Sequence, residues 1–151
     1  MDRNILLNAL RDFLSENMAL SAATDDVPIP IKDRYILRAT PDFLFDPLPR
    51  LYIFEGTEGV SQRGRVKERD LEVVLTGLVN PSDYRSTYTL DADCINAFLK
   101  QIQKVINTKP MKYNDRQIPV FEEGNDIYYI VGDPSFMAVE ITVTLKYITD
   151  Y

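Results

Sequence analysis

The most regular pattern in the chain lies near its C-terminal end, in the segment MAVEITVTLKY at residues 137–147. Apolar side chains alternate there with polar ones without a miss, at Val139, Ile141, Val143, Leu145 and Tyr147. Successive side chains of a β-strand point to opposite faces of the sheet, so this period of two predicts a strand with one buried face. The chain must therefore build a sheet that is covered on at least one side.

Two segments are predicted to be amphipathic helices that supply this cover. Residues 3–18 carry an apolar stripe, with Asp2 before them as a candidate N-cap. The stripe consists of Leu6, Leu10, Phe13 and Leu14. In residues 91–106, DADCINAFLKQIQKVI, apolar side chains recur at the i, i+3, i+4 and i+7 spacing, and two aspartates stand where the helix dipole favours negative charge.

Further strands are predicted on both sides of the second helix. Residues 50–56 and 67–79 are expected to pair as an antiparallel hairpin around a polar loop, and residues 118–131 as a tight hairpin that turns at Gly124-Asn125. Strands and helices do not alternate as they do in βαβ proteins. We therefore expect an α+β fold, with a mainly antiparallel β-sheet of four to five strands and the two amphipathic helices packed on one face.

The predicted strand at 67–79 is apolar on both faces. Leu71, Val73 and Leu75 point one way, whereas Val74 and Leu78 point the other. Such a pattern is typical of a central strand, or of a strand with one face reserved for a partner.

Residues 22–49 form a proline-rich arm within what we expect to be a single domain, residues 1–151. Each of its five prolines removes a backbone donor and favours extended geometry before it. The arm also carries too many apolar side chains to leave in water, among them Phe43, Leu44 and Phe45. It should therefore lie against its own domain or against a partner.

The chain contains no histidine and a single cysteine, Cys94. It thus lacks the usual general base and the commonest zinc ligand, and no motif nominates a nucleophile, a metal site or a nucleotide loop. We expect a protein without catalytic residues or cofactor, in which Cys94 is a buried or half-buried side chain. A small enzyme of unfamiliar type would instead need a carboxylate or thiol of shifted pKa in a closed pocket.

Every apolar run is shorter than the about 18 to 20 residues of a membrane helix, so we expect no membrane span or signal peptide, and synthesis in the cytoplasm.

The loop between residues 55 and 70 places cations at alternate positions, namely Arg63, Arg65, Lys67 and Arg69. If the loop extends the hairpin, all four are predicted to share one face. One interpretation is a flexible finger that binds nucleic acid or an acidic protein surface. The other, which the net charge of −6 favours, is a solvated hairpin tip whose charges discourage edge pairing.

The order of these segments resembles the tail terminator and tail completion proteins of tailed bacteriophages. The likeness is carried by ILLNALRDFL, by the RLYIFEG and LEVVLTGLV strands around the charged loop, by DADCINAFLKQI and by the closing AVEITVTLKYI. The arm at 22–49 is where this chain departs from the shortest members of that family. This departure leaves open which partners it meets, including whether a contractile sheath is among them.

The resemblance implies a structural virion protein, made in the host cytoplasm, that sits at the neck end of the tail. It implies a homo-oligomeric ring, usually a hexamer, that caps the tail tube and joins it to the head connector. The partners would be further copies of the chain, the tail tube protein and the connector or neck protein, while DNA only passes through the lumen. Another neck or head-tail connector protein is an alternative, as is a nucleic-acid-binding accessory protein that uses residues 63–69.

The resemblance also suggests roles for particular surfaces. It implies that the loop with Arg63, Arg65, Lys67 and Arg69 lies near the lumen or the tube interface. A ring with a heterologous interface needs two different patches on each subunit. The candidate patches are the sheet face around Val74 and Leu78 and the arm with Phe43, Leu44 and Phe45.

Overall fold

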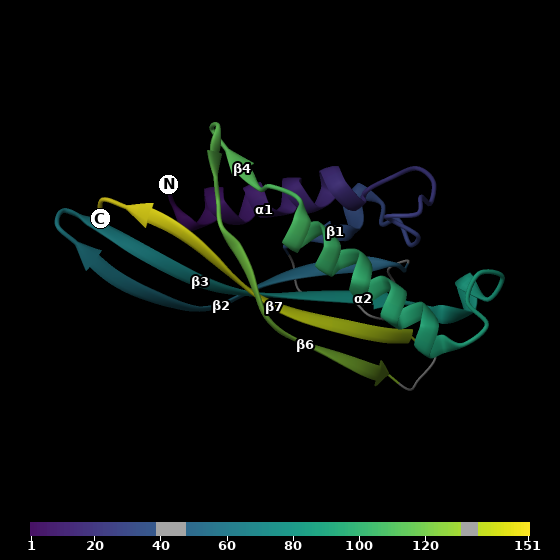
Figure 1. Cartoon of the computed structure of the whole chain (residues 1–151). Coiled ribbons are helices and arrows are strands. Elements are labelled where there is room, and N and C mark those ends of the chain that lie inside the picture. Colours follow the sequence, from purple (N-terminus) through teal and green to yellow (C-terminus); the bar gives the residue numbers. More distant parts are fainter. Residues whose placement is uncertain (39–47, 131–135) are drawn as a thin grey trace.

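The computed structural model describes residues 1–38, 48–130 and 136–151, and it has an α+β architecture (Figure 1). The helical elements are α1 (Arg3–Met18), the 3-10 turns η1 (Asp33–Tyr35) and η2 (Pro81–Tyr84), and α2 (Asp91–Thr108). The strands are β1 (Ile36–Leu37), β2 (Arg50–Arg63), β3 (Val66–Val79), β4 (Lys112–Tyr113), β5 (Arg116–Gln117), β6 (Val120–Ile130) and β7 (Phe136–Thr149).

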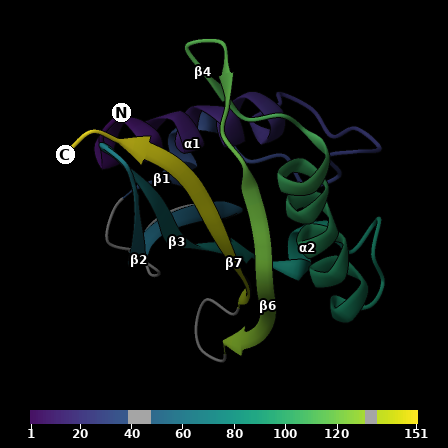
Figure 2. The ribbon, with the colours of Figure 1, turned by 60° about the vertical axis from the view of Figure 1, so that its left-hand side comes forward.

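Five strands form one twisted sheet in the order β1-β2-β3-β7-β6 (Figure 2). Every neighbouring pair is antiparallel except β1 and β2, and β4 and β5 form a separate two-stranded ladder. Both long helices lie on the same side of the sheet (Figures 1 and 2). The predicted fold class is therefore confirmed, and β3 is the central strand that its two apolar faces indicated.

The main core lies between the two helices and the sheet face that they cover. On β7, Val139, Ile141, Val143 and Leu145 are fully buried, which confirms the alternation in this segment. The stripe of α1 is buried too, and the Asp2 carboxylate caps this helix by accepting a hydrogen bond from the Ile5 N–H at 2.9 Å. Full burial of a large aliphatic side chain stabilises the fold by about 1.5–3 kcal/mol, so each of these periodic positions contributes substantially to folding.

The Phe98 ring of α2 packs against the sheet at Gly77 of the central strand. A Cβ atom at this position would lie 2.8 Å from the Cε2 atom of Phe98 and 3.0 Å from the Cγ2 atom of Val139. Only a residue without a side chain therefore lets the Phe98 ring lie directly on β3.

The first part of the proline-rich arm packs on its own domain. Ile29, Ile31 and Ile36 are buried in the main core, and β1 adds a short parallel strand beside β2. The Gln101 side chain of α2 forms two hydrogen bonds with the backbone of Ile29. Of the two placements expected for the arm, the structure shows the first for residues 22–38. Phe43, Leu44 and Phe45 lie outside the described residues.

The hairpin predicted within residues 118–131 is wrong, because β6 is one continuous strand. Residues on both sides of Gly124 pair with β7, and an irregularity of register between Glu122 and Gly124 absorbs one extra residue. Pairing with β7 from Phe136 to Leu145 satisfies more backbone groups than a local turn would. Gly124-Asn125 consequently lies inside a strand.

The polar loop expected between β2 and β3 is also mostly strand. The two strands pair as far as Arg63 and Val66, which leaves only Gly64 and Arg65 in the turn. Gly64 has a φ of 62°, a left-handed conformation that glycine adopts without steric cost. Together with the end of β7, this hairpin extends past the N-terminal end of α1 (Figure 1).

Candidate assembly surface

We call the sheet face turned away from α1 and α2 the outer face. At one end it carries a small apolar cluster of Tyr52, Leu78, Phe136 and Ala138. Leu78, predicted as an interface residue, is only 1% exposed, so it offers almost no accessible surface in the structure. Val74, between Phe54 and Thr142 on the neighbouring strands, is half-buried. A subunit contact at Val74 stays a prediction.

The other end of the outer face is hollowed. A shallow depression of ≈ 680 Å³, which we call the acidic trough, crosses β2, β3, β7 and β6. Its lining residues are Thr57, Gly59, Asp70, Glu72, Phe121, Glu122, Glu123, Thr144 and Lys146. The trough has open space at Gly59, where an added Cβ atom would meet no atom within 4 Å.

Carboxylates dominate the electrostatics of the trough. Four of its residues are acidic and one is basic, which gives a net charge of −3 at neutral pH. The Lys146 ammonium lies 3.0 Å from an Asp70 carboxylate oxygen and 5.9 Å from the centroid of the Phe121 ring. Glu122 accepts hydrogen bonds from Gln103 and Asn107 of α2. Glu72 and Glu123 are exposed, so they are the carboxylates of the trough that are most accessible to a binding partner.

Negative charge continues along the outer face beyond the trough. Asp126 on β6 pairs with Glu140 on β7, and Tyr128 lies one side-chain position further along β6. The charges of Glu140 and Asp126 raise the pKa of the Tyr128 phenol, because its phenolate would add another negative charge beside them. The outer face is thus an acidic surface with exposed aromatic rings, Phe121 and Tyr128.

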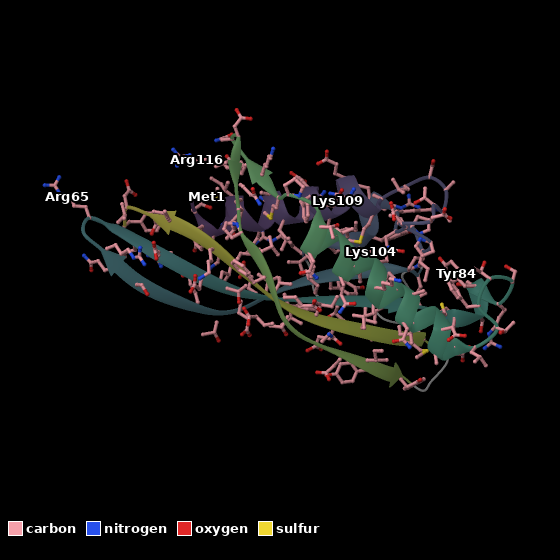
Figure 3. All side chains as sticks on the ribbon, viewed as in Figure 1. Met1, Arg65, Tyr84, Lys104, Lys109 and Arg116 are labelled. Carbon is pink, nitrogen blue, oxygen red and sulfur yellow. The ribbon has the colours of Figure 1, made fainter. Side chains whose placement is uncertain are left out.

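The tip of the β2–β3 hairpin, residues 60–66, is exposed throughout and carries Arg63 and Arg65 without any acidic residue. The Arg63 side chain is 76% exposed and makes only a 3.5 Å contact with Glu68. Arg65 lies in the turn and points away from the sheet into solvent (Figure 3). Two apolar side chains, Val60 and Val66, are exposed beside them.

The prediction that the four cations of this loop share one face is wrong. Residues that pair across an antiparallel ladder point to the same face, and Arg63 pairs with Val66 whereas Arg69 pairs with Val60. Because the turn occupies Gly64 and Arg65, the alternation is interrupted there. Arg63 therefore lies on the outer face, while Lys67 and Arg69 lie on the side of the helices.

Arg69 is engaged in a network at the root of the hairpin. Its guanidinium lies 3.1 Å from the Glu58 carboxylate, donates to the Thr149 hydroxyl at 2.7 Å and donates to the Tyr151 carbonyl oxygen at 2.7 Å. Arg3 of α1 contacts the same Glu58 carboxylate at 3.1 Å, and the Tyr147 hydroxyl donates to it as well. The network therefore ties α1, both strands of the hairpin and β7 together.

The network shifts two pKa values. Partial burial acts to raise the pKa of Glu58, but hydrogen bonds from Tyr147 and Arg3 and the nearby positive charge outweigh it and hold this pKa below its usual range. Burial and the hydrogen bond to Glu58 raise the pKa of Tyr147 to about 12. Both shifts favour the charge states that the network needs, an ionised Glu58 and a protonated Tyr147.

Cys94 is fully buried near the beginning of α2. Burial, and secondarily the charge of Asp91, raise the pKa of its thiol, which works against a nucleophilic thiolate. Within residues 1–38, 48–130 and 136–151, no group of three or more acidic, cysteine or histidine side chains is arranged to hold a metal ion. Among these same residues, no helix is long and apolar enough to cross a membrane.

Sequence reasoning missed both the acidic trough and the network around Glu58. A signal for part of the trough existed, because Asp70 and Glu72 occupy alternate positions of the predicted strand 67–79 and must share a face. For the network there was none, since Arg3, Glu58 and Tyr147 are far apart in the chain and meet only when the sheet and α1 assemble.

The amino-acid sequence matches no protein-family model, and no curated protein gives a match.

Proposed function

We propose that this protein is a structural assembly protein of a bacteriophage tail, a tail terminator whose copies form a ring on the end of the tail tube. Its partners are then further copies of itself, the tail tube protein and the head connector or neck protein. The proposal rests on the resemblance of the sequence pattern, together with the surfaces that the fold presents.

One observation carries most of this proposal. A single protomer presents two unlike surfaces, the basic hairpin tip and the acidic outer face with its trough. A head-to-tail ring needs two different, complementary patches on each subunit. A protein that acts by assembly also needs no reactive group, which agrees with the buried Cys94 thiol and its raised pKa.

The hairpin that extends past α1 supports a role in contacting neighbours. Its two strands pair without a register shift from Glu58 to the turn, and the Glu58 network holds its root against α1 and β7. A stiff projection loses little conformational entropy when it binds, so it favours association with a further subunit.

Two experiments test the proposal. Native mass spectrometry of the purified chain, from low to high micromolar concentration, should reveal a closed ring with a defined number of copies. Negative-stain images of tail tubes incubated with the chain should show added density at one end only. A chain that remains monomeric at every concentration and leaves the tube ends unchanged would contradict the proposal.

The alternative of a nucleic-acid-binding protein makes a different prediction. Binding to duplex DNA through Arg63 and Arg65 would weaken steeply with rising salt and would be lost when both residues are replaced by glutamate. The engagement of Arg69 with Glu58, Thr149 and Tyr151 leaves fewer free cations for phosphate than the sequence suggested. This observation favours the assembly protein.

A further inference from the structure

We infer that the hairpin tip of one copy docks in the acidic trough of a second copy, with Arg63 and Arg65 facing Glu72 and Glu123. The inference rests on the self-assembly proposed above, and it names the two surfaces that meet.

Charge complementarity is the first argument. The tip carries two exposed arginines and no carboxylate between residues 60 and 66, within a chain whose net charge is −6. The trough has a net charge of −3, and Glu72 and Glu123 are both exposed. Complementary surfaces of this kind steer association and fix the orientation of the partners.

Shape supports the same pairing. A two-residue turn is narrow, with its strands about 5 Å apart, so the tip fits a shallow hollow of ≈ 680 Å³. The trough offers room at Gly59, which has no side chain and open space at its Cβ position. Apolar surface also meets apolar surface: Val60 and Val66 are exposed at the tip, and the Phe121 ring at the edge of the trough is 47% exposed.

The contact must be made between copies. The tip and the trough belong to the same antiparallel ladder, in which Arg63 pairs with Val66 and Gly59 pairs with Asp70 without an irregularity between them. A continuous ladder cannot fold back on itself, so the tip of a protomer never reaches its own trough. A contact between two different patches on identical subunits is heterologous, and it generates either a ring or a filament.

The main experiment exchanges charge between the two surfaces. The tip variant is R63E/R65E and the trough variant is E72K/E123K. In either variant alone, tip and trough carry the same sign, so self-association should weaken at least about tenfold. In an equimolar mixture each tip finds a trough of opposite sign on the other variant, so alternating assemblies should reappear in native mass spectra and in size-exclusion chromatography with light scattering.

Control variants separate docking from net charge. K32E/K100E changes the net charge by the same amount as the tip variant, and D12K/E16K changes it by the same amount as the trough variant. All four residues are exposed and lie outside the hairpin tip and the trough. Both controls should assemble like the unmodified chain. Circular dichroism and urea unfolding of each variant verify that loss of assembly is not loss of fold.

A variant without charge changes gives an independent test. Gly59→Tyr places a ring in the trough, where a Cβ atom meets nothing within 4 Å. It should weaken self-association at least about tenfold while stability stays within about 0.5 kcal/mol. Gly124→Ala, also at an open outer-face position, is the matched control and should assemble normally.

The outcomes are distinguishable. Rings that form equally well in the charge variants and in Gly59→Tyr would overturn the docking of tip in trough and leave the proposed function intact. Failure of the mixture to restore assembly would also overturn it. An unmodified chain that never self-associates would contradict the proposed function itself. Loss of DNA binding in R63E/R65E, with assembly unchanged, would assign the tip to nucleic acid instead.

Discussion

Gln101 and Ile29 form a closed pair of hydrogen bonds in the core. The Gln101 amide nitrogen donates to the Ile29 carbonyl oxygen, and the Gln101 amide oxygen accepts from the Ile29 N–H, both at 2.8 Å. Gln101 is 1% exposed and Ile29 is fully buried, so neither backbone group has access to water. This one side chain therefore holds the proline-rich arm against α2 as a strand partner would.

Replacing Gln101 should detach this part of the arm. Gln101→Met keeps the length of the side chain but leaves a buried donor and a buried acceptor without partners. We expect the free energy of unfolding to fall by about 2–4 kcal/mol in urea denaturation. Gln117→Met, at an exposed position of β5, is the control and should change stability by less than about 0.5 kcal/mol. Equal stability of the two variants would contradict this account of the arm.

Enlarging Gly77 should separate α2 from the sheet. A methyl group at this position would overlap the Phe98 ring, so Gly77→Ala should destabilise the fold by about 1–3 kcal/mol. The same methyl group at Gly59 meets nothing within 4 Å and should cost no such energy. Thermal unfolding of both variants measures the difference, and a neutral Gly77→Ala would show that the packing at this site is loose.

Acidic pH should weaken the root of the hairpin through Glu58. Its pKa is lowered in the folded state, so its stabilisation is present above the unfolded value near 4.5 and is lost as the pH falls through the lower, folded value. Glu58→Gln should cost about 1.5–3 kcal/mol at neutral pH, and the difference from the unmodified chain should shrink in acid.

A matched variant for this test is Glu68→Gln, which affects only the exposed contact with Arg63. Its stability should change by less than about 1 kcal/mol at any pH. If the cost of Glu58→Gln were the same at neutral and acidic pH, the carboxylate charge would not be the source of the stabilisation.

Alkaline pH should act through Tyr147. Its folded pKa of about 12 lies above the ordinary value of 10.0, so its stabilisation is present below pH 10 and is lost as the pH rises toward 12. Tyr147→Phe removes this ionisation, so its stability should depend less on pH across that interval. The tyrosinate absorbance should also lose a late-titrating component. Tyr129→Phe, at a side chain that is 67% exposed, should leave that component in place.

The parts of the fold that follow from local periodicity were predictable. The alternation around Val143 and the helical spacing around Phe98 each reflect a buried face that the sequence displays over many residues. The hairpin predicted at Gly124-Asn125 was wrong because the preference of these residues for a turn is local. The pairing of β6 with the long strand β7 overrides this preference. The strand content of residues 57–63 was hidden because these residues have no buried face and hence no apolar alternation.

Less of the candidate site could be predicted. The sequence shows the positions of the cations, but the sheet face on which each side chain lies depends on where the turn falls. A shift of the turn by one residue decides whether Arg63 and Arg69 lie on the same face. The trough depends on which residues of β2 and β6 come to lie beside Asp70 and Glu72. That arrangement is set by strand order and register, which a pattern within one segment does not contain.

The regular ladder between Gly59 and the turn fixes how far the hairpin tip extends from the sheet. Lengthening each strand by one residue would advance the turn by about 3.4 Å and rotate the Arg63 side chain to the opposite face, whereas lengthening each by two would advance it by about 7 Å and restore the face. Only insertions of an even number of residues in each strand keep the Arg63 side chain on the outer face. If the tip reaches a neighbour, hairpin length then sets subunit spacing, and with it the diameter of the assembly, in discrete steps.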